Sequence, residues 1–214
     1  MKKQVKKTAL FLMLLTASIS FGQEKDTSDK RDSFKFGVKA GVNFSNVYDE
    51  QGQDFVADGK TGFAAGGFLS IPIGKVIGFQ PEVMYSQKGF KATGNLLGFG
   101  YNYTRTSSFL DIPLLLQVKP VKGFALVAGP QFSYLLDTKN EFNGSTSTTQ
   151  EDAINSQNYK KNIFGFVVGA DVNFDQLVLS GRVGWDISQS DTDGNSSDPR
   201  YKNQVIQLTL GYTF

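Results

Sequence analysis

A strict two-residue alternation of apolar and polar side chains recurs in eight separate segments of the chain. Segment 34–45, for example, reads FKFGVKAGVNFS, with an apolar residue at every even position. Because successive side chains of a β-strand point to opposite faces of a sheet, this alternation predicts strands with one apolar and one polar face. The predicted strands cover residues 34–45, 63–73, 77–86, 110–118, 124–136, 164–174, 177–188 and 206–214.

Short and long connections alternate between these strands. Short turns are expected near 74–75, 119–122 and 175–176, and long polar loops at 48–60, 89–100, 139–160 and 189–200. Outer-membrane barrels typically have short periplasmic turns and longer extracellular loops. The sequence therefore predicts an all-β fold, an eight-stranded antiparallel transmembrane up-and-down β-barrel over residues 34–214, with both of its ends on the periplasmic side.

A soluble lipocalin-like ligand binder would show the same alternation, with the apolar side chains turned inward instead of toward lipid. The polar faces carry mainly Gly, Ser, Asn and Gln, with fewer charges than a soluble exterior would have, which favours the membrane barrel. Aromatic residues also gather at strand ends, as they do at membrane interfaces. Near the short turns they are Phe34, Phe36, Phe79, Phe124, Phe174, Tyr212 and Phe214. Near the long loops they are Phe44, Phe63, Tyr85, Tyr101, Tyr103, Phe132, Tyr134, Phe164 and Trp185.

Residues 1–22 have the features of a cleaved secretory signal peptide. The basic stretch MKKQVKK precedes a short apolar stretch that begins TALFLMLL, and Ser20-Phe21-Gly22 places small residues at the expected cleavage site. The apolar stretch is too short for a membrane-spanning helix. We therefore expect signal-peptide-directed export to the cell outer membrane, with residues 23–33 as a polar periplasmic leader.

The composition excludes several classes of function. The chain has no histidine and no cysteine, so neither can serve as a metal ligand, a general base or a nucleophile. We expect no cofactor, no metal and no enzymatic activity, because barrel enzymes rely on histidine-containing sites. Removing the four lysines of the signal segment from the 22 basic residues leaves 18 against 20 acidic residues, which gives no reason to expect nucleic acid as a partner.

Four ionisable residues are predicted at similar mid-strand depth on the inner face of the barrel: Lys39, Glu82, Asp111 and Arg182. An isolated charge inside so narrow a barrel is costly, so these charges must pair or be hydrated. Glu82 and Asp111 are expected on neighbouring strands, with Lys39 or Arg182 reaching them across the lumen. The cluster is either a salt-bridged plug, which the packed interiors of small barrels favour, or the lining of a gated ion path.

Segment 191–202, DTDGNSSDPRYK, has the alternate oxygen-bearing residues of a calcium loop. These are Asp191, Asp193, Asn195 and Ser197. The turn glycine and the final bidentate glutamate of such loops are both missing, so a solvated outer loop is the favoured interpretation.

The last predicted strand, VIQLTLGYTF, ends on an aromatic residue. It is expected to close the barrel against the first strand and leave no open edge. Its lipid-facing row is the expected signal for the barrel-assembly machinery. That row contains Leu208, Leu210, Tyr212 and Phe214.

Several segments resemble the PorT-like outer-membrane β-barrel proteins, the "porin family" of gram-negative bacteria. The resemblance runs through FGVKAGVNFSN, FQPEVMYSQKG, SFLDIPLLLQVKP, GFALVAGPQFSYLL, GFVVGADVNF and LTLGYTF, and covers most of 34–214. It implies an eight-stranded outer membrane protein beta-barrel domain. A founding member of the family is associated with protein secretion and gliding machinery, but the family resemblance does not imply one activity.

The chain is therefore expected to be an outer-membrane protein of structural or binding type, serving membrane integrity, surface contact or the support of a secretion assembly. The alternative within the membrane is a small-solute porin-like channel. Expected partners are outer-membrane lipids and lipopolysaccharide, the barrel-assembly machinery during biogenesis, and a secretion-system or surface partner. Loops 89–100 and 139–160 are the expected contact surfaces, because rigid scaffolds usually carry function on loops.

Overall fold

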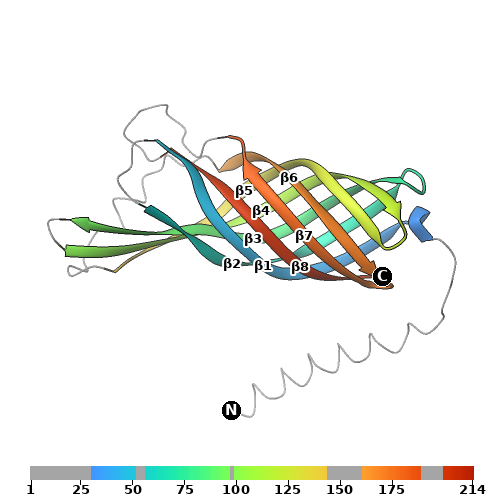
Figure 1. Cartoon of the computed structure of the whole chain (residues 1–214), viewed down its shortest axis with the longest axis horizontal. Coiled ribbons are helices and arrows are strands. Elements are labelled where there is room, and N and C mark those ends of the chain that lie inside the picture. The colour runs from blue at the N-terminus through green and yellow to red at the C-terminus, as the bar shows by residue number, and fades with distance from the viewer. Residues whose placement is uncertain (1–29, 52–55, 97–98, 144–160, 189–199) are drawn as a thin grey trace, which may run out of the picture. The chain divides into compact units, whose positions relative to one another are not determined.

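The computed structural model describes residues 30–51, 56–96, 99–143, 161–188 and 200–214. Within them, eight β-strands form a closed barrel in which each strand pairs with its neighbours in sequence and β1 also pairs with β8 (Figure 1). A 3-10 turn, η1 (Lys30–Asp32), precedes the barrel. The strands are β1 (Lys35–Gln51), β2 (Val56–Pro72), β3 (Ile77–Leu96), β4 (Phe99–Val121), β5 (Phe124–Asn143), β6 (Asn162–Phe174), β7 (Leu177–Asp186) and β8 (Arg200–Thr213).

All neighbouring strands are antiparallel, which confirms the predicted eight-stranded all-β barrel. The three short turns also lie where the sequence predicts them, at 73–76, 122–123 and 175–176. Two of these turns contain a positive φ angle, +80° at Gly123 and +53° at Asp175. Glycine adopts such angles freely and aspartate does so more readily than most residues, which explains how these turns reverse the chain so tightly.

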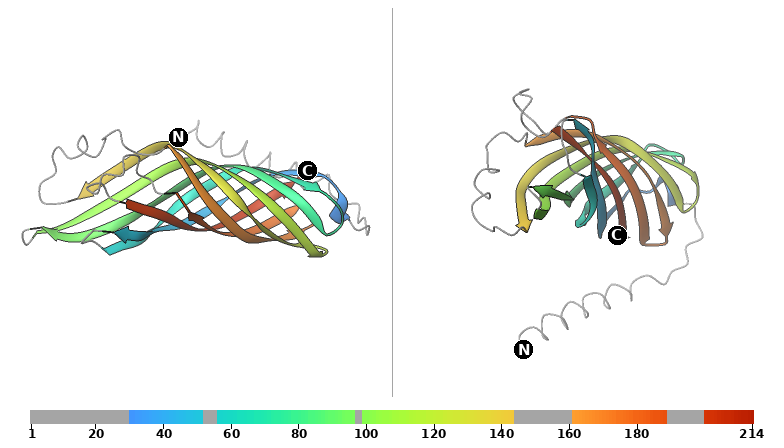
Figure 2. Two further views of the ribbon diagram at one scale, coloured as in Figure 1. Left: turned by 90° about the horizontal axis from the view of Figure 1, so that it is seen from above. Right: turned by 60° about the vertical axis from the view of Figure 1, so that its left-hand side comes forward.

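The predicted extent of the long loops is wrong, because the strands continue well past their predicted bounds at that end. Of segment 89–100, residues 89–96 belong to β3 and 99–100 to β4; residues 48–51, 56–60, 139–143 and 200 are also in strands. The β3–β4 ladder reaches Leu96 and Phe99, so these strands project beyond the barrel as a ribbon (Figure 1, green; Figure 2). A strand outside the lipid needs no apolar face, so the alternation stops while the backbone hydrogen bonds continue.

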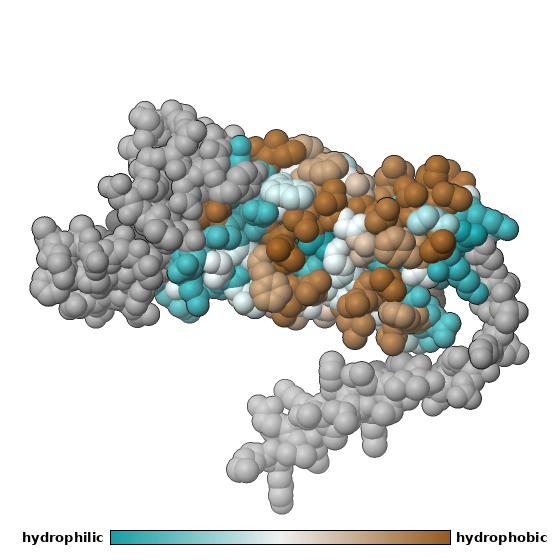
Figure 3. Space-filling view, in the orientation of Figure 1, coloured by the Kyte–Doolittle hydropathy of each residue, from teal (hydrophilic) through white to brown (hydrophobic). Residues whose placement is uncertain are grey.

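The side-chain directions confirm an apolar exterior. Val38 and Leu210, on adjacent strands, are 55% and 58% exposed, whereas the neighbouring Lys39 is 4% exposed. Figure 3 shows hydrophobic side chains gathered over the outside of the barrel. Because a soluble barrel would bury these side chains and expose the lysine, the arrangement does not favour the soluble lipocalin-like alternative.

The aromatic residues lie at both ends of this apolar exterior. Ring contacts join some of them across strands: Phe132 and Phe164 have centroids 5.3 Å apart. The side chains of Tyr101 and Tyr103 lie outside the described residues. Phe34, Phe36, Phe174 and Phe214 are exposed near the short turns, and Phe44, Phe63, Tyr85, Phe132, Tyr134 and Phe164 near the other end. The half-buried ones are Phe79, Phe124, Trp185 and Tyr212.

Three predicted features of the sequence fall outside the described residues. They are the signal peptide (1–22), most of the polar leader (23–33) and most of the calcium-like segment (191–202). In the described part of the chain, no helix has both the length and the apolar character needed to cross a membrane.

Gly169 of β6 marks a close approach between strands inside the lumen. A Cβ atom added there would collide with the carbonyl oxygen of Gly181 and lie 2.7 Å from Cδ of Arg182. At Gly181 itself, the nearest atom to an added Cβ would be Cδ2 of Leu208 at 3.7 Å, an ordinary contact. The two glycines therefore form a matched pair, one that must lack a side chain and one that need not.

We expect Gly169→Ala to lower the free energy of unfolding by about 1–3 kcal/mol, the usual cost of forcing extra atoms into a packed interior. The measurement is the urea midpoint, followed by the heat-modifiable migration of the folded barrel in gels. Gly181→Ala is the control and should stay near the wild-type midpoint. Equal midpoints for the two variants would contradict the packing at Gly169.

Candidate functional site: the charged lumen

The lumen contains two groups of charged side chains at different depths. The turn-side cluster lies nearer the short turns and comprises Lys39 (β1), Glu82 (β3), Asp171 (β6) and Arg182 (β7). The loop-side cluster lies nearer the projecting ribbon and comprises Lys88 (β3), Asp111 (β4) and Asp186 (β7). All these residues lie on the inward face of their strands and are buried.

Ion pairs join the members of the turn-side cluster. Lys39 Nζ lies 2.6 Å from Glu82 Oε2. Arg182 Nη2 lies 2.7 Å from Asp171 Oδ1 and 3.3 Å from Glu82 Oε1. Each of the four side chains is at most 4% exposed. Two cations therefore balance two carboxylates, and the cluster is neutral inside a site that water barely reaches.

Amide and hydroxyl groups extend the turn-side cluster to further strands. The Gln80 amide donates hydrogen bonds to Glu82 Oε1 (2.9 Å) and Asp171 Oδ2 (3.1 Å). Gln117 donates to Gln80 Oε1 (2.7 Å), and the Ser70 hydroxyl donates to Gln117 Oε1 (2.9 Å). With these contacts the network includes side chains of β1, β2, β3, β4, β6 and β7. It therefore crosses the lumen rather than following one wall.

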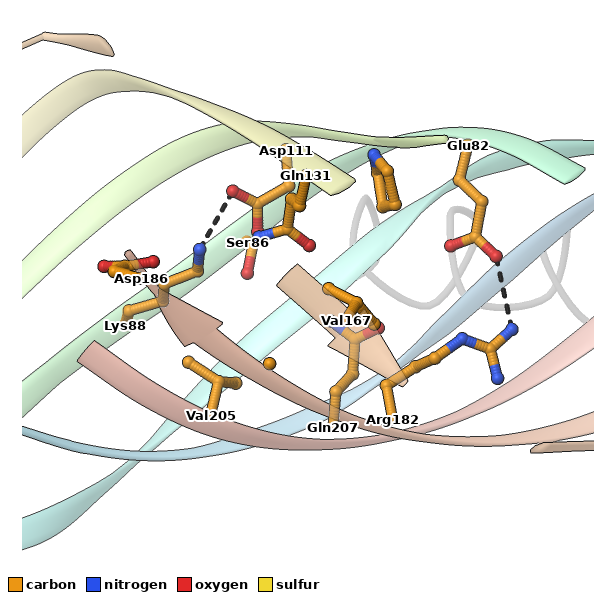
Figure 4. Close-up of a pocket in the computed structure, with 12 residues that line it drawn as sticks. Glu82, Ser86, Lys88, Asp111, Gln131, Val167, Arg182, Asp186, Val205 and Gln207 are labelled. Carbon is orange, nitrogen blue, oxygen red and sulfur yellow. Dashed lines mark hydrogen bonds and ion pairs between the residues drawn. The ribbon is translucent and has the colours of Figure 1, made fainter. Parts of the chain in front are cut away.

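The loop-side cluster is built around Lys88. Its ammonium donates to Asp111 Oδ1 (3.0 Å) and to Ser133 Oγ (3.3 Å). Asp186, on the facing wall, accepts a hydrogen bond of 2.6 Å from the Asn203 amide. Figure 4 shows Lys88 between the carboxylates of Asp111 and Asp186. This second cluster thus ties β3, β4, β5, β7 and β8 together.

The structure places three of the four predicted charges together and separates the fourth. Lys39, Glu82 and Arg182 are in one cluster, but Asp111 pairs with Lys88 and not with the predicted partners. In the β3–β4 ladder Asp111 is opposite Met84, two residues nearer the loop end than Glu82. Lys88 lies on the same face of β3, four residues beyond Met84 toward the loop end, and its long side chain reaches back to Asp111.

Sequence reasoning missed Lys88, Asp171 and Asp186 as members of the charged clusters. Lys88 precedes Gly89, where the sequence predicts the start of a loop, although the every-second-residue pattern from Glu82 through Ser86 continues to Lys88. The place of Asp171 could have been predicted from the short turn between β6 and β7. If Phe174 pairs with Leu177 across that turn, counting back along both strands places Asp171 diagonally beside Arg182 on the same face.

A small cavity of about 30 Å³ lies between the two clusters (Figure 4). The cavity is large enough to hold water and is lined mainly by polar side chains that can hydrogen-bond to it. The residues that line the cavity are Glu82, Ser86, Lys88, Asp111, Pro113, Gln131, Val167, Arg182, Gly184, Asp186, Val205 and Gln207.

A small apolar cluster also lies inside the barrel. Leu115, Val127 and Val167 pack together on the inward faces of β4, β5 and β6.

The described residues show no grouping of three or more His, Cys, Asp and Glu side chains that could hold a metal ion. The carboxylates of the lumen instead face lysine and arginine side chains. Chemically, the turn-side cluster neutralises buried charge, and both clusters hold strands in fixed positions relative to one another.

The predicted C-terminal row lies at the seam between β8 and β1. The backbone N–H of Phe214 donates to the Phe36 carbonyl oxygen (2.9 Å), and the two rings stack with centroids 5.1 Å apart. The Tyr212 ring lies 5.2 Å from that of Phe214, and its hydroxyl donates to Gln176 Oε1 (2.6 Å). Leu208 and Leu210, in the same row, face outward. The role of this row as an assembly signal stays a prediction.

Glu82→Gln should lower the free energy of unfolding by about 3–5 kcal/mol, because Lys39 and Arg182 would keep their buried charges and lose a shared counter-ion. The urea midpoint of the folded barrel measures this loss. The control is Glu141→Gln, since Glu141 pairs with Lys139 at 2.7 Å but both side chains are about half exposed or more. An exposed ion pair contributes little to the free energy of unfolding, so the control should have the urea midpoint of the wild type. A Glu82→Gln midpoint equal to that of the control would contradict the cluster.

Comparison with known proteins gives one family match and several structural ones. Residues 21–192 match the model of the outer membrane protein beta-barrel domain family. No curated protein matches the chain. Ail, the attachment invasion locus protein of Yersinia pestis, is 12% identical with a TM-score of 0.43, covering 84% of this chain and 98% of that one. Neisserial surface protein A has 10% identity, a TM-score of 0.47 and coverage of 84% and 97%.

A major outer membrane protein from Thermus thermophilus is 16% identical with a TM-score of 0.46, covering 85% of this chain and 100% of that one. The family match spans most of the chain, and a family of this kind implies an outer-membrane location. The protein belongs to the outer membrane protein beta-barrel domain family.

Proposed function

We propose that this protein is a structural or binding barrel of the outer membrane, with a lumen closed by ion pairs and with projecting strands that contact a partner outside the cell. The observation that carries the proposal is the neutral turn-side cluster, which joins side chains of six strands across the lumen. The proposal assigns no catalytic role and no cofactor to the chain, which has no histidine and no cysteine.

Closure of the lumen follows from the cost of separating the buried charges. Moving Arg182 away from Glu82 and Asp171 would leave two uncompensated carboxylates in a site that is almost dry. An ion that crossed the lumen would also have to separate these side chains, whose network joins six strands across it. Both points favour the plug over the porin-like channel.

The binding half of the proposal rests on the ribbon of β3 and β4, along which β5 pairs with β4 as far as Asn143. β4 has 23 residues, although about 9–11 are enough to cross a bilayer, so a large part of it lies outside the membrane. Segment 89–100 is therefore a largely strand-supported surface rather than a flexible loop. A surface already held by ladder hydrogen bonds loses less conformational entropy when a partner binds. Lipopolysaccharide, a surface partner or a component of a secretion assembly is the proposed contact, the last in line with the PorT-like resemblance.

The signal-peptide features of residues 1–22 support export before assembly in the membrane. We include the C-terminal row in the same proposal. Leu208, Leu210, Tyr212 and Phe214 would be recognised by the barrel-assembly machinery before β8 closes against β1. The seam contacts of Phe214 with Phe36 would form only afterwards.

The wild-type barrel should show no steady unitary current in planar lipid bilayers, because the buried ion pairs close the lumen. Arg182→Ala removes the central cation and is expected to open it or to destabilise the barrel. Folding of both proteins is checked beforehand by heat-modifiable gel migration. A steady wild-type current whose amplitude shifts in Arg182→Ala would contradict closure and establish the channel alternative.

Phe214→Ala should reduce the amount of folded barrel assembled in cells several-fold, yet leave folding of the purified chain into detergent micelles nearly unchanged. Phe174→Ala is the matched control, since both rings are 61% exposed near the short turns. The control should assemble normally in cells. If Phe214→Ala and Phe174→Ala assemble to the same extent, the proposed signal is wrong; if Phe214→Ala also fails in detergent, Phe214 acts through the seam alone.

A further inference from the structure

Positive charge is concentrated around one side of the barrel end that carries the short turns. The cations come from η1, β1, β4 and the turns after β2 and β4, so they lie beside β1 to β5 rather than all round the rim. Among the residues described at this end, the acidic side chains are Asp32 and Asp175. The basic side chains, here named the basic rim, are Arg31, Lys35, Lys75, Lys119 and Lys122.

Hydrogen bonds bring three segments of the basic rim together. Lys119 Nζ donates to the Arg31 carbonyl oxygen (2.9 Å), and Arg31 Nη1 approaches the Pro120 carbonyl oxygen (3.4 Å). The backbone N–H of Lys119 donates to the Val76 carbonyl oxygen (2.7 Å), which brings the turn containing Lys75 beside it. Lys119 and Arg31 therefore lie side by side, with the turn that contains Lys75 next to them.

Two lysines of the basic rim stand where a membrane surface would lie. Lys75 is exposed and is flanked by Ile73 and Val76, whose side chains are 71% and 49% exposed. Lys122 is exposed and follows Val121, which is 58% exposed. Lysine side chains beside lipid extend their apolar stems along it and hold the ammonium group at the headgroups. The apolar neighbours favour a lipid ligand over a water-soluble polymer, which would leave them exposed.

We propose that the basic rim binds the phosphate group of an anionic glycerophospholipid in the periplasmic leaflet of the outer membrane. Lys75 and Lys122 contact the headgroup phosphate, while Arg31, Lys35 and Lys119 supply the surrounding positive potential. The inference uses the membrane orientation of the proposed function, with the short turns in the periplasm, but it does not depend on a closed lumen. Lipid binding by the basic rim and closure of the lumen can therefore be disproved separately.

Native mass spectrometry of the folded, detergent-solubilised barrel tests this inference. The dissociation constant of the first bound lipid is measured for phosphatidylglycerol and for phosphatidylcholine of the same chain length. The wild type should bind phosphatidylglycerol more tightly. Lys75→Gln with Lys122→Gln should weaken that binding about fivefold for each lysine removed, because a cation near an anionic surface contributes about 1 kcal/mol. Binding of phosphatidylcholine should not change.

The matched control is Lys60→Gln with Lys161→Gln, a half-buried and an exposed lysine at the opposite end of the barrel, both outside the proposed contact segments 89–100 and 139–160. It should keep the wild-type preference for phosphatidylglycerol. All variants are first shown to be folded by heat-modifiable migration, and the bilayer recording of the lumen is made on the same samples.

Three results would overturn the inference. The first is an unchanged preference for phosphatidylglycerol in the variant that lacks Lys75 and Lys122. An equal loss of binding in the control variant counts in the same way, because it would mean a general effect of surface charge. The second is displacement of phosphatidylglycerol by inorganic phosphate but not by chloride at equal ionic strength, which would mean a site for a free anion. The third is loss of binding to isolated peptidoglycan in this variant with lipid binding intact, which would mean a polymer ligand.

Discussion

The pairing of β1 with β8 is the interaction on which the rest of the structure depends. It runs from Gly37 opposite Thr213 to Gln51 opposite Arg200, with a register shift after Tyr48, and converts a sheet with two edges into a closed barrel. In lipid, each backbone group left at an open edge would cost several kcal/mol, so only the closed form is suited to a membrane. Closure also defines an inside and an outside, and the strict alternation of the sequence follows from that difference.

A closed barrel of eight strands leaves a lumen so narrow that the side chains fill it. Charged residues placed there lose their water and must neutralise one another. Arg182 and Glu82, separated by 100 positions in the sequence, meet for this reason. Since a well-packed apolar filling is often as stable as buried ion pairs, stability alone does not account for the charges. We infer that they specify which strands face each other across the lumen, because Glu82 pairs with cations of β1 and β7, whereas Asp111 pairs with a cation of β3.

The sequence was sufficient to predict the closed barrel, its short turns and the direction of its apolar face, because lipid imposes a side-chain pattern on every residue that it touches. Outside the lipid that constraint ends, and residues 89–96 have the composition of a loop although they are strand. Partners within the lumen were harder to predict, since they depend on register. A bulge between Ser108 and Phe109, for example, shifts β4 against β5, and alternation does not reveal such a shift. The pairing of Asp111 with Lys88 was missed for a different reason, because the predicted strand 77–86 ended before Lys88.

The central claim is that charges on different strands stabilise the barrel by pairing inside its lumen. A double-mutant cycle on Asp171 and Arg182, whose charged atoms are 2.7 Å apart, tests it most directly. The free energy of unfolding is measured for the wild type, Asp171→Asn, Arg182→Met and the double variant. The account predicts a favourable coupling of about 1–3 kcal/mol, as expected for buried residues in direct contact. A coupling within experimental error of zero would contradict it.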